Sequence, residues 1–280
     1  MHVNNPNPPT FRRLCGGCRL GFLADAVSAF LPMSASLADD ASTPSPAAQA
    51  AASAAQAAPT SAENVPFSPS AADVARVRQR VQSDPAFASR SAQEKENLVR
   101  LLLQGTSAPA RTNDGRSLAL VAPQVQGYGK TDADAAAKTK LYATVDGASD
   151  PSNLAARAEF ADGYWKFTVR LHNVGSRSQY LGFSGFTLLK LGGEGGKWAN
   201  PRLRTSFSVD GRAIYGVRVP AHGERTVTVS VSDPSYSLYE YVLRGGSKTA
   251  PLGGFVNFRP AEDKTAPTVS VPFTGIFKAL

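Results

Sequence analysis

The stretch DGYWKFTVRLHNVG, residues 162–175, decides the fold class of this 280-residue chain. Every second residue in its centre is apolar: Trp165, Phe167, Val169 and Leu171. The residues that alternate with them are polar: Tyr164, Lys166, Thr168, Arg170 and His172. A period of two is typical of a β-strand with one face in a core and the other in water. The Asp162-Gly163 pair ahead of it indicates a tight hairpin turn.

The same alternation continues through residues 138–280, which hold about ten short strand candidates at close spacing. A second Asp-Gly turn, at residues 210–211, predicts a hairpin over residues 206–219. No segment with helical period interrupts the series. The pattern therefore predicts a mainly β protein with an antiparallel sandwich over residues 138–280.

Two segments of this region, FTVRLHNVGSRSQYLGF (167–183) and VPAHGERTVTVSV (219–231), resemble Ig-like β-sandwich modules of extracytoplasmic proteins. The shared features are a strand that ends in an Asn-x-Gly turn and a later valine-rich strand that follows a proline turn. The resemblance implies an Ig-like fold that serves adhesion, ligand binding or assembly. It carries no catalytic residues onto this chain.

The first 69 residues divide into two segments of different composition, residues 1–40 and residues 41–69. Residues 1–40 run from arginines through an apolar stretch to the small residues SASLA, which is the order of an export signal. An amphipathic N-terminal helix is the alternative, and the apolar stretch is too short for a transmembrane span. Residues 41–69 are rich in Ala, Pro, Ser and Gln and predict a disordered tether.

Residues 70–105 predict two short helices, because capping boxes begin at Ser70 and at Ser91 and apolar residues follow at helical spacing. Neither helix can bury its apolar face alone, so we expect the pair to dock on the C-terminal domain. Docking of the helices on each other or on a partner is the alternative. Residues 106–137 predict an irregular connector to the sandwich.

The chain carries a net positive charge, and most of the excess lies in residues 138–280. The formal net charge is +8, and residues 138–280 carry eighteen Lys and Arg against eleven Asp and Glu. Such a balance favours acidic proteins, acidic glycans or nucleic acid. The cations are scattered along the sequence and not clustered, which favours a solubilising surface over a specific binding site.

Motifs that would carry chemistry are weak. Cys15 and Cys18 have the spacing of a redox motif or of two metal ligands, but no further ligands lie near them in the sequence. If the export signal is cleaved, both cysteines are absent from the mature protein. The glycine-rich run 192–197 lacks the Ser or Thr of a phosphate-binding loop. The histidines, His2, His172 and His222, are isolated in the sequence. We therefore expect no catalytic residue, no metal site and no cofactor.

The candidate partner-binding surface consists of four cations: Lys166, Arg170, Arg212 and Arg218. Alternation places the first two on one strand face and the last two on one face of the second hairpin. An exposed strand face is flat, so it suits a broad contact with a protein or a polyanion better than a small molecule. The alternative is that this face is only solvated.

These observations predict a non-enzymatic, exported binding or assembly subunit of a bacterial envelope or secretion apparatus, in the periplasm or outside the cell, with a protein partner. The first alternative is a glycan-binding or adhesive module, which would expose a planar aromatic platform and could take an anionic glycan. The second is an enzyme, which would join His172 or His222 to a carboxylate in a deep pocket. Nucleic-acid binding ranks last.

Overall fold

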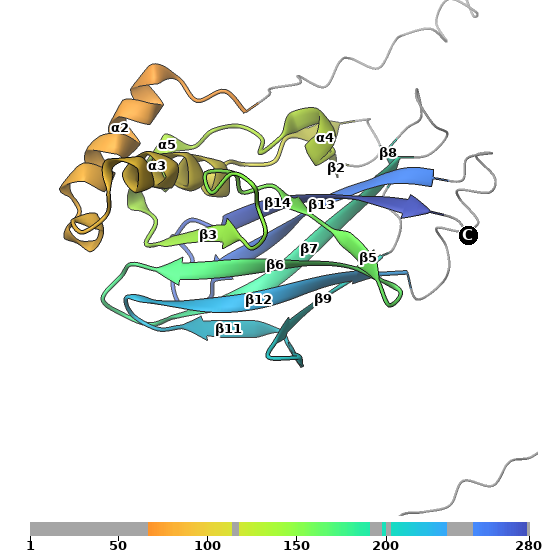
Figure 1. Cartoon of the computed structure of the whole chain (residues 1–280). Helices are drawn as coiled ribbons and strands as arrows, with labels where there is room; N and C mark the ends of the chain where they lie inside the picture. The colour runs from red at the N-terminus through yellow and green to blue at the C-terminus, as the bar shows by residue number, and fades with distance from the viewer. Residues whose placement is uncertain (1–66, 114–117, 191–197, 200–202, 234–248, 279–280) are drawn as a thin grey trace, which may run out of the picture. The chain divides into compact units, whose positions relative to one another are not determined.

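The computed structural model describes residues 67–113, 118–190, 198–199, 203–233 and 249–278 (Figure 1). The expected export signal, nearly all of the expected tether, both cysteines and the glycine-rich run 192–197 lie outside these residues. All described residues fall within one compact unit of the chain.

Two antiparallel sheets form the sandwich. The first has the strand order β10-β9-β12-β6-β3, and β5 pairs with β6 outside that order. Its strands are β3 (Leu141–Val145), β5 (Glu159–Ala161), β6 (Tyr164–Asn173), β9 (Arg204–Val209), β10 (Arg212–Ile214) and β12 (Gly223–Ser232).

The second sheet has the strand order β11-β7-β13-β14-β4, and β8 pairs with β7 outside that order. Its strands are β4 (Ala156–Arg157), β7 (Gln179–Lys190), β8 (Trp198–Ala199), β11 (Gly216–Val219), β13 (Thr249–Pro260) and β14 (Val269–Lys278). The short strand β4 runs parallel to β14, whereas the other pairings are antiparallel.

The strand order is that of an immunoglobulin sandwich. Numbered A to G along the chain, β3, β6, β7, β9, β12, β13 and β14 form one sheet in the order A-B-E-D and another in the order C-F-G. These are the two sheets of a seven-stranded immunoglobulin domain. The predicted fold class, a mainly β antiparallel sandwich of Ig-like type, is therefore confirmed.

The register predicted for residues 165–171 is also confirmed. Trp165, Phe167, Val169 and Leu171 are buried, and the residues between them are only half-buried. Phe167 stacks on Phe273 of the second sheet, with 5.1 Å between ring centroids. The indole Nε1 of Trp165 donates a hydrogen bond to the carbonyl of Ile276, so the two sheets also meet through a polar contact.

Helices cover one margin of the sandwich. They are α2 (Ala71–Ser83), α3 (Ala92–Thr106) and α5 (Ala133–Lys138), and the 3-10 turn η1 (Pro85–Phe87) joins the first two. Both expected capping boxes form, at Ser70 with Asp73 and at Ser91 with Glu94. Helix α3 contacts β3 of one sheet and β14 of the other (Figure 1). The helices and strands therefore share one core, as expected for a helix pair that docks on the sandwich.

The connector 106–137 is more ordered than its composition predicts. It contains β1 (Arg111–Asn113), β2 (Leu118–Leu120), α4 (Pro123–Gln126) and α5. The buried Gln126 amide accepts from the amide of Ala110 and donates to the carbonyl of Val121. Gln126 therefore pairs with backbone groups before β1 and after β2, and a periodicity analysis does not detect such a buried contact.

Residues 156–161 form a ribbon that pairs with both sheets. Strand β4 pairs with Phe273 and Thr274 of β14, and the Ala158 amide donates to the Thr274 carbonyl at 2.7 Å. Strand β5 pairs with residues 164–166 of β6. We call residues 156–161 the bridging ribbon.

The Arg80 side chain makes the main polar contacts between α2 and the α5 region, and its removal should lower the stability of the fold measurably. Its guanidinium donates to the carbonyls of Ala136 and Thr139 at 3.1 and 2.6 Å, and only 12% of the side chain is exposed. We expect Arg80→Ala to lower the free energy of unfolding by about 1.5 kcal/mol in urea titrations, because the carbonyls of Ala136 and Thr139 lose a charged donor. The exposed Arg76, which pairs with Asp134, is the control, and Arg76→Ala should cost much less. Equal losses in the two variants would contradict this role of Arg80.

Among the described residues, no helix is both long enough and apolar enough to cross a membrane.

Candidate functional site

The polar face of β6 forms the outer surface of the first sheet, where residues of three strands meet in cross-strand rows. One row joins Tyr142 of β3, His172 of β6 and Glu224 of β12. The next row contains Thr144 and Arg170. Two hollows lie along this surface, one beside Lys166 and one beside His172.

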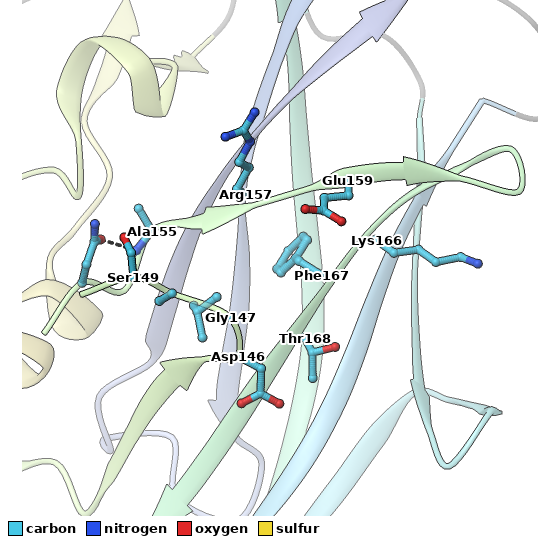
Figure 2. A pocket seen from close by; sticks show the side chains of 12 residues that line it. Asp146, Gly147, Ser149, Ala155, Arg157, Glu159, Lys166, Phe167 and Thr168 are labelled. Atoms are coloured by element: carbon cyan, nitrogen blue, oxygen red, sulfur yellow. Dashed lines mark hydrogen bonds between the residues drawn. The ribbon is translucent and has the colours of Figure 1, made fainter. Parts of the chain in front are cut away.

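The first hollow has a volume of about 730 Å³ and lies where the edge of β6 changes partner (Figure 2). Strand β3 ends at Val145 and β5 begins at Glu159, and both pair with this edge, so residues 167–168 face a gap between them. Figure 2 shows Phe167, Thr168 and Glu159 around this space. Two cations and two carboxylates line it: Lys166, Arg157, Asp146 and Glu159.

The second hollow, of about 400 Å³, lies between α3 and the sheet. His172 is central to it, with 18% of its side chain exposed. The ring stacks on Tyr142 at 4.4 Å, its Nε2 lies 3.0 Å from Thr144 Oγ1, and its Nδ1 lies 3.3 Å from Glu224 Oε2. Burial lowers the pKa of His172 to about 4 and outweighs the attraction of Glu224, so the imidazole is neutral at pH 7.

The cations on this face are neutralised by carboxylates from other segments. Arg170 pairs with Asp146 at 3.5 Å and with Glu224 at 3.0 Å, and Asp146 and then Glu224 raise the pKa of its guanidinium. Lys166 pairs with Asp162 at 3.3 Å and lies over the ring of Tyr164. The face is therefore hollowed and not flat, and its two predicted cations, Lys166 and Arg170, both have carboxylate partners. Their use in a partner contact stays a prediction.

The other two predicted cations lie elsewhere. The Asp210-Gly211 turn forms as predicted, but only β10 pairs with β9, and the chain then crosses to the other sheet, where β11 pairs with β7. Arg212 therefore belongs to the first sheet and Arg218 to the second, where it pairs with Glu262 at 3.2 Å. The chain crosses between the sheets at Tyr215 and Gly216. A Cβ at Gly216 would lie 2.5 Å from the Tyr180 hydroxyl oxygen, so the Tyr180 side chain leaves no room for a larger residue there. The structure brings together Lys166 and Arg170 only.

The contact between His172 and Glu224 is the feature that would favour an enzyme, but its geometry favours a structural role. Both ring nitrogens are occupied, and the ring is stacked against Tyr142. A histidine with a pKa of about 4 is a weak base at neutral pH. The described part of the chain contains no cluster of three or more potential metal ligands.

The sequence did not reveal the carboxylates of this face. Glu224 and Asp146 reach it from β12 and from the turn after β3. Strands β6 and β12 pair, but no tight turn joins them, so no local signal fixes their register. The alternation of β12 did indicate which of its residues face outward.

No family model matches this chain. No curated protein sequence matches it either. Solved structures share parts of its fold. The PapD-like domain 7 of human CEP192 is 12% identical in sequence, and the match covers 51% of this chain and 86% of that chain with a TM-score of 0.32. The CooA pilin subunit of enterotoxigenic Escherichia coli matches with 12% identity, 49% of this chain, 98% of that chain and a TM-score of 0.29. The E. coli chaperone DraB matches with 10% identity, 50% of this chain, 55% of that chain and a TM-score of 0.27. Similarities of this size carry no inference about function, and the Ig-like assignment rests on the strand order itself.

Proposed function

We propose that this chain is a non-enzymatic binding subunit of an extracytoplasmic assembly, such as a bacterial envelope or secretion apparatus, and that it acts through protein contacts. The export signal expected in residues 1–40 is the basis for the compartment. The apolar surface beside the bridging ribbon is the observation that supports a protein partner.

This surface surrounds a hollow of about 810 Å³ on the margin formed by β5 and β14. Phe160 and Ile276 both line it and are 57% and 53% exposed. Exposed apolar side chains that gather at one place and are rimmed by polar residues are a feature of interaction surfaces. The same hollow is lined by charges of both signs: Arg157, Glu159 and Lys278. We call these five residues the margin patch.

An apolar centre with a charged rim is the composition of a protein–protein interface. Because the rim carries both signs, it suits a protein partner with mixed charges better than a polyanion. Lys166 and Arg170 lie on the neighbouring face, and we expect them to contribute only at the periphery of the contact, because their charges are already paired.

The partner contact can be tested with Phe160→Asp combined with Ile276→Asp. Both side chains are largely exposed, so the fold should persist while the apolar centre of the contact is lost. The full chain, tagged and expressed in its native cells, should recover a stoichiometric partner that the double variant recovers at least about tenfold less.

The matched control is Tyr215→Asp, because Tyr215 is 92% exposed but lies between β10 and β11 and not in the margin patch. Recovery should be normal for this variant. Equal recovery by all three proteins would refute the margin patch as the contact, and cofractionation of the chain with cytoplasmic proteins would refute the compartment.

A further inference from the structure

We propose that the outer face of the second sheet binds an acidic saccharide, one whose sugar rings carry carboxylate or sulfate groups. This site is separate from the margin patch and does not depend on the proposed protein contact. It is a hollow of about 540 Å³ over β7 and β13, and its main features are Gly182, Arg259 and Lys264.

Gly182 keeps the hollow open without any structural need to be glycine. It lies within β7, and its φ angle is not in the left-handed region. A Cβ at this position would meet only the Arg259 carbonyl oxygen, at 3.9 Å, which is ordinary contact. A glycine inside a strand weakens the strand, and such a residue often marks the close approach of a ligand.

Gly216, the cross-strand neighbour of Gly182, has a different reason to be glycine. A Cβ there would collide with the side chain of Tyr180. Tyr180 is 39% exposed, and the guanidinium of Arg218 lies 5.9 Å from its ring centroid. The Tyr180 side chain therefore covers Gly216, while the backbone at Gly182 is open. Tyr180 and Gly182 are two residues apart on β7 and so share one face of the strand, where the apolar face of a sugar can pack on the ring.

The hollow also holds two cations that are free to bind an anion. Arg259 is opposite Gly182 in the sheet register, and Lys264 follows in the loop after β13; both are exposed. Within the described residues, neither has a carboxylate within ion-pair distance. The nearby acids have other partners, since Glu262 pairs with Arg218 and Asp263 accepts hydrogen bonds from Thr265.

These features together define the ligand class. The ring of Tyr180 suits a sugar, the open backbone admits it, and the two cations select for negative charge. The charges around this hollow differ from those beside Lys166 and Arg170, where each cation already has a carboxylate partner. Uronic acids and sulfated sugars share the required chemistry, and the experiment separates them.

The test is isothermal titration calorimetry of the full chain with three probes: galacturonic acid oligomers, heparin oligosaccharides and neutral maltooligosaccharides. We expect one or both acidic probes to bind, with affinity that falls as salt is raised, and the neutral probe not to bind. Binding of the carboxylate probe alone would identify a uronate site, and binding of the sulfated probe alone a sulfate site. Failure of both acidic probes, or equal binding of the neutral probe, would refute the proposal.

Gly182→Thr is the decisive variant. Threonine suits a strand, so the melting temperature should be unchanged or higher, while the new side chain fills the hollow and weakens binding at least about tenfold. Arg259→Gln should weaken binding in the same way, and it provides a second test if Gly182→Thr does not fold. Arg212→Gln removes an exposed cation of the other sheet and should bind as the parent does.

Two further results, from the variants, would also overturn the assignment. The first is parental affinity in both Gly182→Thr and Arg259→Gln, which would place any binding elsewhere. The second is equal or tighter binding of oligothymidylate with the same loss in these variants, which would identify a site for single-stranded nucleic acid.

Discussion

Replacement of Phe167 by alanine is expected to lower the free energy of unfolding by about 3–5 kcal/mol, the usual cost of removing a large buried aromatic side chain. Phe167 is 7% exposed and stacks on Phe273, so the truncation removes a contact between the two sheets. Urea titration monitored by tryptophan fluorescence measures the loss.

Lys166→Ala is the matched control, because Lys166 is adjacent in sequence and has its side chain on the opposite face of β6. Its pair with Asp162 is exposed to solvent, so this variant should lose much less than 1 kcal/mol. Similar losses in the two variants would show that the register of β6 is misassigned.

Acid should destabilise the fold through His172. Because its folded pKa, about 4, lies below the ordinary value of 6.5, the unfolded chain binds the proton first as the pH falls. The stability is therefore fully present above pH 6.5 and is lost as the pH falls to 4, by about 3 kcal/mol in total. Between pH 7 and pH 5 the loss should be about 2 kcal/mol.

The variant His172→Gln isolates this effect. It should be less stable at pH 7 but should show little change between pH 7 and pH 5, because the group that titrates in this range is gone. The charged groups that face His172 are Glu224, Asp146, Arg90 and Arg170, and all four are retained in this variant. An unchanged pH dependence in the variant would assign the loss to another group.

Local patterns were sufficient for much of the fold. Alternation identified the buried residues of β6, and the Ser70 and Ser91 capping boxes located both helices, because these signals depend on neighbours within a few residues. The turn at residues 210–211 was also correct. The predicted hairpin fails just after this turn, because the chain crosses to the other sheet and β11 pairs with β7. At this crossing Gly216 leaves room for Tyr180, a residue 36 positions earlier, and no local pattern indicates such a contact.

The candidate site was less predictable, because its character depends on pairs of residues from separate strands. Arg170 is recognisable as an outward-facing cation, but the carboxylates that neutralise it come from Asp146 and Glu224. The positive charge expected on this face from Lys166 and Arg170 is therefore offset by acids from other segments. The two free cations beside Gly182 become recognisable as a group only when β7 and β13 are paired.

The bridging ribbon has a mechanical consequence. A sandwich of two separate sheets can hinge open at its margin while the hydrogen bonds within each sheet stay intact. Here the ribbon is bonded to β14 at one end and to β6 at the other, so such a hinge would have to break strand pairing. We therefore expect the two sheets to stay joined on the side where Phe160 and Ile276 meet the solvent, because separating them there costs backbone hydrogen bonds.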